Sequence, residues 1–208
     1  MGLGELFDEP TDTREELMGA TYRALCEHGY AELTIQRISD QFPKSKSLLY
    51  HHYDSKDELL LDFLSYLLDH FESTMPRADD EAAVALAALL DHVLPTDPDP
   101  ERRQFIAAII ELRAQAATDP AYRAHFTRST AFLHDAFVRI IETGVAEGTF
   151  RPVDADRVAS LLVATIEGAM VQQVTIDTEM ASTRSGELRA ELDSYIERQL
   201  LTVDGEGE

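Results

Sequence analysis

The sequence predicts an all-α fold, and two features of its patterning support this. Over nearly all of the 208 residues, apolar side chains recur at the three- and four-residue spacing of amphipathic helices. The alternation of β-branched and polar residues that is typical of strands is almost absent. Glycine, proline and acidic turns separate the helical stretches, so we expect a three-helix N-terminal domain followed by an antiparallel helical bundle.

The first expected helix runs from Thr13 to His28. Thr13 and Glu16 have the spacing of a capping box, and Gly29 follows the last helical position. The preceding residues 1–12 are acidic, and we expect them to form a disordered N-terminus.

Two short helices and a long one follow, and this order predicts a helix-turn-helix. The expected elements are a short helix from Thr34, its N-cap, to Phe42, a break at Pro43, a second short helix from Ser45 to about Tyr53, and a long helix capped by Asp54 or Ser55. On the second short helix, Leu49 and Tyr53 are expected to face inward against Ile35 and Ile38. The remaining side chains of that helix then point outward, where they can reach another molecule.

The rest of the chain is expected to form the antiparallel bundle. Its expected helices cover about 80–94, 101–118, 120–148, 154–177 and 187–202. The polar stretch Thr178–Gly186 is interpreted as a loop, and residues 204–208 as an acidic tail. We therefore place an N-terminal domain at 13–56 and a C-terminal domain at 57–203.

Charge is distributed unevenly along the chain. The formal net charge is −21, which is unfavourable for binding to phosphate. However, Lys44, Lys46 and Lys56 are the only lysines, they lie within thirteen residues of one another, and residues 34–56 carry a net charge of +2. This local cluster favours a contact between that segment and nucleic acid.

The overall composition resembles that of proteins from salt-in halophiles. The chain is acidic, poor in lysine relative to arginine, and lacks Asn and Trp. A strongly hydrated carboxylate surface keeps such proteins dissolved where salt screens long-range repulsion. We therefore expect a halophilic archaeon as the source, with an ordinary acidic protein of a mesophile as the alternative.

The sequence offers no motif for catalysis, a cofactor or a metal. The Glu-x-x-His pairs of ferritin-like bundles are absent, as are the HExxH, GxSxG, P-loop and GxGxxG patterns. The one cysteine, Cys26, allows no intrachain disulfide or cysteine metal site, and its helical surroundings predict a core position. Neither a signal peptide nor an apolar run of about 18 residues is seen. We expect a cytoplasmic protein that is not an enzyme, contacts no membrane and carries no cofactor or metal.

The segment TIQRISDQFPKSKSLLYHHYDSKDELL resembles the N-terminal signature of the TetR family of transcriptional regulators. The matching positions are Thr34, Ile38, Ser45, Lys46, Leu49, Tyr50, His52, Ser55, Lys56, Glu58 and Leu59, with Tyr53 where the family has Phe. CEHGY before this segment, and ELRAQAATDPAYRAHF and AEGTFRPVDADRVASLLVATIEG after it, are similar to further stretches of the family.

The resemblance implies a homodimer that represses transcription by binding a palindromic operator in double-stranded DNA and is released by a small-molecule effector. The sequence departs from the family pattern at Pro43-Lys44, which replaces Gly-Val, at Ser47-Leu48, which replaces Gly-Thr, and at His51, which replaces a Tyr. Proline cannot adopt the left-handed conformation of a turn glycine, so the turn is where the family geometry transfers least directly.

The second short helix corresponds to a recognition helix, which projects side chains into the major groove while its surroundings contact phosphates. The residues expected to contact DNA are Thr34, Lys44, Ser45, Lys46, Ser47, Leu48, Tyr50, His51 and Lys56. Thr34 and Lys56 lie at helix N-termini, where backbone N–H groups and the helix dipole favour a phosphate. His51 is expected to read a base. Leu48 either contacts a thymine methyl group or packs into the helix junction.

The resemblance implies two further sets of residues in the C-terminal helices. Apolar stripes on the last two helices are expected to pair with those of a second copy, with burial inside the monomer as the alternative. The interface candidates are Leu161, Leu162, Thr165, Ala169, Leu188, Leu192, Tyr195, Ile196 and Leu200. The middle helices are expected to hold a small apolar or amphipathic effector. Candidates for its polar contacts are His70, Glu111, Gln115, His125, His134 and Gln172.

The alternative function is that of a helical bundle that binds ligands or proteins but not DNA. The lysine cluster in an otherwise lysine-free chain favours the DNA-binding regulator. Binding to DNA from upstream of the gene discriminates between the two interpretations.

Overall fold

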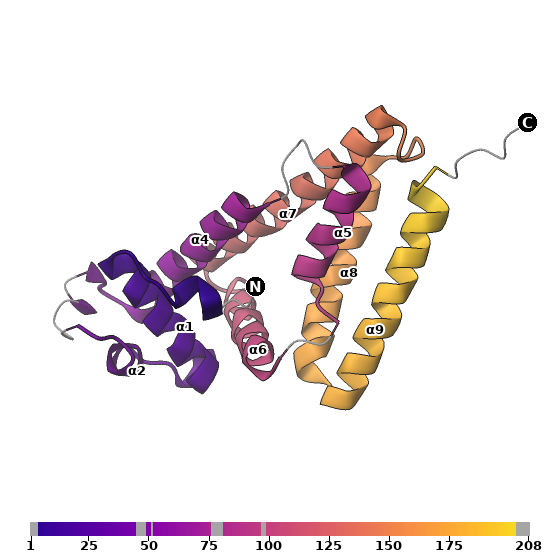
Figure 1. The fold of residues 1–208 in the computed structure, drawn as a ribbon. Coiled ribbons are helices and arrows are strands. Elements are labelled where there is room, and N and C mark those ends of the chain that lie inside the picture. The colour runs from indigo at the N-terminus through magenta and orange to yellow at the C-terminus, as the bar shows by residue number, and fades with distance from the viewer. Residues whose placement is uncertain (1–3, 45–48, 51, 76–80, 97–98, 203–208) are drawn as a thin grey trace, which may run out of the picture. The chain divides into compact units, whose positions relative to one another are not determined.

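The computed structural model describes residues 4–44, 49–50, 52–75, 81–96 and 99–202, which are mostly helical (Figure 1). The helices are η1 (Gly4–Phe7, a 3-10 helix), α1 (Thr13–Glu32), α2 (Ile35–Asp40), α4 (Lys56–Thr74), α5 (Ala82–Val93), α6 (Pro100–Gln115), α7 (Pro120–Glu147), α8 (Ala155–Thr175), α9 (Thr178–Tyr195) and η2 (Ile196–Leu200, a π-helix). Within the described residues, β pairing is limited to one isolated bridge between Phe150 and Leu201. The all-α prediction is therefore confirmed, and the predicted tail at 204–208 lies outside the described residues.

The chain divides into two compact units that differ from the domains predicted at 13–56 and 57–203. The first unit combines Met1–Thr74 with Pro98–Arg128, and the second combines Met75–Asp97 with Ser129–Glu208. Helices α4 and α6 therefore belong with the N-terminal helices. Short helices such as α2 bury little apolar surface by themselves, so they need longer neighbours to complete a core.

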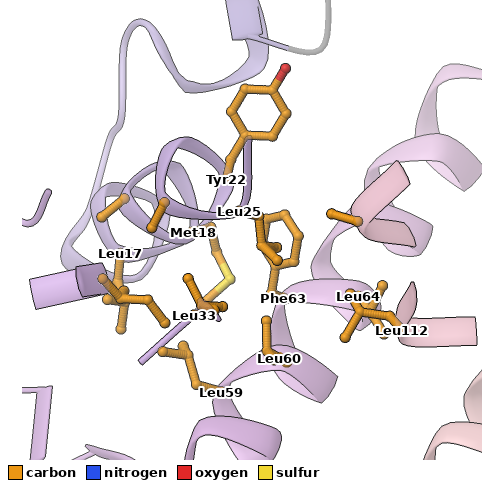
Figure 2. Close-up of a cluster of buried hydrophobic side chains, with 14 of the residues drawn as sticks. Leu17, Met18, Tyr22, Leu25, Leu33, Leu59, Leu60, Phe63, Leu64 and Leu112 are labelled. Atoms are coloured by element: carbon orange, nitrogen blue, oxygen red, sulfur yellow. The ribbon is translucent and has the colours of Figure 1, made fainter. Parts of the chain in front are cut away.

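Leucine and aromatic side chains form the core of the first unit (Figure 2). The residues labelled there are each at most 3% exposed: Leu17, Met18, Tyr22 and Leu25 of α1, Leu33 directly after α1, Leu59, Leu60, Phe63 and Leu64 of α4, and Leu112 of α6. The ring centroid of Phe63 lies 6.4 Å from those of both Phe7 and Phe105. These contacts join η1, α4 and α6 into one core.

Residues Gly4–Phe7 form the helix η1, where the sequence predicted disorder. Phe7, the last residue of η1, is buried, and its ring centroid lies 5.1 Å from that of Tyr22. The prediction for residues 1–12 rested on acidic composition and is wrong for this part. A single aromatic ring buries enough apolar surface to fix a short segment against a core.

Helix α1 differs from the prediction at both ends. Its N-cap is Asp12 instead of Thr13, because the Asp12 carboxylate accepts the backbone N–H of Glu15 at 2.9 Å. The helix also continues to Glu32. Gly29, at φ 65°, produces a kink inside the helix where the sequence suggested an end.

Helix α8 supplies the core of the second unit. Leu162, Ile166, Ala169 and Gln173 are buried at the three- and four-residue spacing of one helix face. Gln173 Nε2 donates to the Pro95 carbonyl at 2.9 Å and so fixes the chain that follows α5. By length and composition, α8 is the one described helix that could cross a membrane, a property shared by the buried core helices of other folds.

Helix α9 begins at Thr178, so the loop predicted at Thr178–Gly186 is wrong. Asp177 caps the helix by accepting two backbone N–H groups of its first turn at 3.0 and 3.3 Å. Ala181 and Ser185, four residues apart, are buried, while most of this segment is exposed. The segment is polar because it presents most of its surface to solvent.

Candidate nucleic-acid interface

The helix-turn-helix packs as its apolar pattern predicts. Ile38 and Leu49 are fully buried in the core, and Ile35 and Tyr53 pack against it. Thr34 is the N-cap of α2, since its hydroxyl accepts the backbone N–H of Arg37 at 3.2 Å. These contacts fix the inner face of the motif and leave its outer face for another molecule.

The outer face is described in part. Tyr50, a predicted DNA contact, is 55% exposed. His52 is exposed as well, with its ring centroid 6.5 Å from that of Tyr53. The predicted contacts Ser45, Lys46, Ser47, Leu48 and His51 lie outside the described residues. Their roles stay predictions.

Lys44 follows Pro43 in the turn and contacts the first turn of α1. Its Nζ lies 2.7 Å from the Thr13 hydroxyl and 2.7 Å from Glu16 Oε2. The turn is thus held against α1 by a hydrogen bond and an ion pair. Because Glu16 offsets part of its charge, Lys44 attracts a phosphate less strongly than an unpaired lysine would.

Lys56 opens α4 directly after a side-chain cap. The Ser55 hydroxyl accepts the backbone N–H of Glu58 at 3.1 Å, which makes Ser55 the cap among the two candidates. Lys56 Nζ lies 3.3 Å from the Tyr30 carbonyl oxygen and 4.1 Å from the centroid of the Tyr30 ring. The ammonium group is therefore held at a helix N-terminus, where a phosphate is also favoured.

An ion pair connects α1 with α4 beside the motif. Arg14 Nη2 donates to Asp62 Oδ1 at 2.7 Å, and the Tyr53 hydroxyl donates to Asp62 Oδ2 at 2.5 Å. Burial acts to raise the pKa of Asp62, but the hydrogen bonds from Arg14 and Tyr53 and the charge of Arg14 lower it overall. The carboxylate therefore stays ionised and holds the end of the motif to α4. No local pattern in the sequence indicates this contact.

Four of the effector candidates belong to the first unit, and only His125 has a buried polar atom without a partner. His70 is half-buried on α4, and Gln115 donates to the Glu111 carbonyl at 3.2 Å. The Glu111 carboxylate accepts the Tyr30 backbone N–H at 2.8 Å, and its role toward an effector stays a prediction. His125 is 8% exposed, and its Nδ1 has no hydrogen-bond partner among the described residues. Burial, together with the charge of Arg128, lowers the pKa of His125 to about 4.

The other two candidates belong to the second unit. His134 Nε2 lies 3.2 Å from the Ser160 hydroxyl and 3.3 Å from the Asp156 carbonyl, so it links α7 to α8. Gln172 is exposed, whereas its neighbour Gln173 is 2% exposed. The effector contact predicted for Gln172 stays a prediction. The repeat that leads from Leu162 through Ala169 indicates Gln173 as the buried neighbour.

The predicted dimer interface separates into buried and accessible residues. Leu162, Ala169, Leu192 and Leu200 are buried inside the protomer, which corrects their assignment as surface for a partner. Leu161 is 49% exposed, and Thr165, Leu188, Tyr195 and Ile196 are partly exposed. Val171 and Met180, at 40% and 50%, were not predicted but are exposed apolar residues of the same two helices. The predicted interface is therefore limited to its exposed and partly exposed residues.

Neither a metal centre nor a reactive thiol is found in the described part of the chain. There, no group of three or more His, Cys, Asp or Glu side chains could hold a metal ion. Cys26 is half-buried and packs against the core, and burial raises the pKa of its thiol to about 11. The thiol is therefore protonated near neutral pH and unreactive.

Comparison with known proteins matches both halves of the chain. Residues 17–63 match the family model described as bacterial regulatory proteins of the tetR family, and residues 82–201 match the C-terminal model of BetI-type transcriptional repressors. The HTH-type transcriptional repressor AcnR of Corynebacterium efficiens is 25% identical over 167 residues, which cover 80% of this chain and 84% of that protein.

Solved structures agree with this assignment. A TetR transcription regulator from Haloarcula marismortui is 35% identical with a TM-score of 0.81, covering 92% of this chain and 100% of its own. A putative transcriptional regulator from Saccharomonospora viridis, solved in complex with choline, is 22% identical with a TM-score of 0.78, covering 93% and 100%. The chain belongs to the TetR family of transcriptional regulators.

Proposed function

We propose that this TetR-family chain represses transcription by binding a palindromic operator as a homodimer. The observation that carries the proposal is the position of Lys44, Tyr50 and Lys56 around the helix-turn-helix of a chain with a net charge of −21. A chain this acidic repels DNA over most of its surface, so its few lysines are informative where they gather. Repressors among its relatives, such as AcnR, support the same activity.

Lys56 and His51 are proposed to play different parts in operator binding. Lys56→Gln removes one phosphate contact, so affinity falls on all DNA sequences alike and the salt slope flattens by about one unit. His51→Ala instead changes the preference among operator variants by about 1–3 kcal/mol at one base pair. Arg157→Gln removes the same charge at an exposed position of α8 and is the matched control for Lys56→Gln. If both test variants bind every operator as the wild type does, the recognition helix is assigned wrongly.

The partner in the proposed dimer is a second copy seated on α8 and α9. The supporting observation is the set of exposed apolar side chains Leu161, Val171 and Met180 on these helices. Two copies on a palindrome supply the specificity that one short recognition helix lacks. Light scattering at high salt is expected to give twice the monomer mass of 23.2 kDa. A monomer at micromolar concentration contradicts the proposal.

The proposal includes adaptation to high salt and a halophilic source. The net charge of −21 and the Haloarcula marismortui relative support it. Salt screens the repulsion among carboxylates, so the thermal midpoint is expected to rise between 0.1 and about 1 M KCl, where the screening length falls from about 10 to about 3 Å. A midpoint that is unchanged across this range favours an ordinary acidic protein.

We further propose release from DNA by a small apolar or amphipathic effector. His125 supports this, because its unpaired, buried Nδ1 would gain a hydrogen bond from a bound polar group. An effector that favours the non-binding state by about 1–3 kcal/mol weakens operator affinity 5- to 150-fold, and operator weakens the effector equally. A thermal-shift screen of fatty acids, acyl thioesters, aromatic acids, choline and cationic drugs tests this. A compound that stabilises the protein without changing operator affinity contradicts release.

A gel-shift with DNA from upstream of the gene tests the proposed function as a whole. A specific shift that unlabelled operator competes away is the expected result. No shift at any salt concentration favours the ligand- or protein-binding bundle. A cytoplasmic location and the lack of enzymatic activity belong to the same proposal, since the relatives are transcriptional regulators.

A further inference from the structure

We propose that Glu111 of α6 and Tyr122 of α7 position Lys56 for its operator phosphate, and that they act through Tyr30. The inference rests on the proposed function, because it assigns control over the DNA contact made by Lys56. All of these residues belong to the first unit. None of the three positioning residues needs to touch DNA.

Tyr30 contacts the Lys56 ammonium group through both its backbone carbonyl and its ring. Lys56 Nζ donates to the Tyr30 carbonyl at 3.3 Å and lies 4.1 Å above the centroid of its ring. One of the three ammonium donors is thus used, which leaves two for a phosphate. A lysine side chain held in place before binding loses less conformational entropy when it meets a phosphate.

Glu111 fixes the backbone of Tyr30. Gly29 has φ 65° and interrupts the regular helix, and the next two backbone N–H groups turn to the Glu111 carboxylate. Tyr30 N–H donates to Oε2 at 2.8 Å and Ala31 N–H at 3.3 Å. A charged acceptor makes these hydrogen bonds stronger than neutral ones. The carbonyl that holds Lys56 therefore belongs to a peptide segment that α6 anchors.

Tyr122 fixes the side chain of Tyr30 through a shared carboxylate. The hydroxyl of Tyr122 donates to Asp57 Oδ1 at 2.9 Å, and that of Tyr30 reaches the same oxygen at 3.4 Å. Tyr122 is only 1% exposed, so α7 holds this carboxylate rigidly. Burial and the bond to Asp57 raise the pKa of Tyr122, which keeps its hydroxyl a donor at neutral pH. The ring beneath Lys56 therefore keeps its orientation only while α7 keeps its place.

The three lysines of this chain make the position of Lys56 directly measurable. Reductive ¹³C-methylation gives one NMR signal for each of Lys44, Lys46 and Lys56, besides that of the N-terminus. The ring current of Tyr30 is expected to shift the Lys56 signal upfield, and Lys56→Gln identifies it by its loss. Tyr122→Phe and Glu111→Gln are expected to move this signal toward the position of an exposed lysine. Tyr66→Phe, a tyrosine outside this junction, is the matched control. An unmoved Lys56 signal in both variants overturns the inference.

A double-mutant cycle on operator affinity tests the consequence for DNA. Tyr122→Phe is expected to weaken operator binding about three- to tenfold, the equivalent of one lost hydrogen bond. In a Lys56→Gln background the same change is expected to have less than about a twofold effect, because its route to DNA is gone. An equal loss in both backgrounds means that Tyr122 acts on folding alone, and overturns the inference. If Lys56→Gln itself leaves affinity unchanged while the NMR signal moves as expected, the phosphate contact in the proposed function is what fails.

Discussion

The two units of the chain differ in how many large apolar side chains they leave exposed. Cations are paired inside both units: Arg14 with Asp62 and Lys44 with Glu16 in the first, and Arg189 with Asp91 in the second. In the second, large apolar side chains stay exposed. Of the five such residues in the described chain, Val84, Leu161, Val171 and Met180 belong to the second unit, and Tyr50 to the first.

This difference indicates which kind of partner each unit can bind. In the described part of the first unit, the one large apolar side chain that is exposed, that of Tyr50, lies on the helix expected to face DNA. The first unit therefore has a complete apolar core and offers polar groups to a partner. The second unit leaves apolar area in water, which association with another molecule would remove. Four variants test this comparison.

The largest effect is expected in the core of the first unit. Phe63→Ala removes a fully buried ring that packs between Phe7 and Phe105, and is expected to lower the free energy of unfolding by about 3–5 kcal/mol. Val84→Ala, at a side chain that is 59% exposed, is expected to change it by less than about 0.5 kcal/mol. Urea denaturation at one protein concentration measures both. Equal losses would contradict the placement of Phe63 in the core and of Val84 on the surface.

The next effect concerns association through the second unit. Leu161→Asp places a charge on an apolar side chain that is 49% exposed. Each copy is expected to lose about 1.5–3 kcal/mol of apolar burial, so the dimer dissociates at least tenfold more readily. Sedimentation at graded concentrations measures this. Gln104→Asp on α6 adds the same charge and should leave the mass unchanged, whereas a stable dimer of Leu161→Asp places the interface elsewhere.

A third effect, which is confined to acid and absent at neutral pH, is expected from His125. Its pKa falls from 6.5 to about 4 on burial, so the unfolded chain binds a proton first as the pH drops. The free energy of unfolding therefore decreases between pH 6.5 and about 4, by up to about 1.4 kcal/mol per pH unit from this group. His125→Gln is expected to flatten that slope. A slope that His125→Gln leaves unchanged would assign the acid sensitivity to other groups.

The smallest effect is expected at the turn of the helix-turn-helix. Lys44→Gln breaks the ion pair with Glu16, which is partly exposed and worth about 0.2–1 kcal/mol of stability. Because salt screens such a pair, the loss should shrink between 0.1 and 2 M KCl. Lys44→Arg keeps the charge and should retain most of the stability. A loss that persists at high salt points to the hydrogen bond with Thr13 as the main contribution.

Much of the fold and of the DNA-facing motif could be predicted from local sequence. Thr34 and Ser55 act as helix caps, Leu49 faces inward, and the helices from α5 to α8 end within a few residues of the expected positions. These features depend on residues three or four apart, which a sequence displays directly. The lysine cluster and the family signature are local for the same reason. They determined where a DNA-binding surface should lie.

The tertiary structure decided what connects these local elements. Arg14 meets Asp62 across 48 residues, and the Glu111 carboxylate meets Tyr30 across 81. No periodicity predicts such pairs, because a carboxylate on a helix surface has the same local pattern whether it contacts solvent or another helix. The burial of Phe7 and that of Gln173, whose neighbour Gln172 is exposed, also depend on which face meets another part of the protein. The sequence by itself therefore determined the helices and their DNA-facing segment. Packing alone decided which polar groups hold that segment in place.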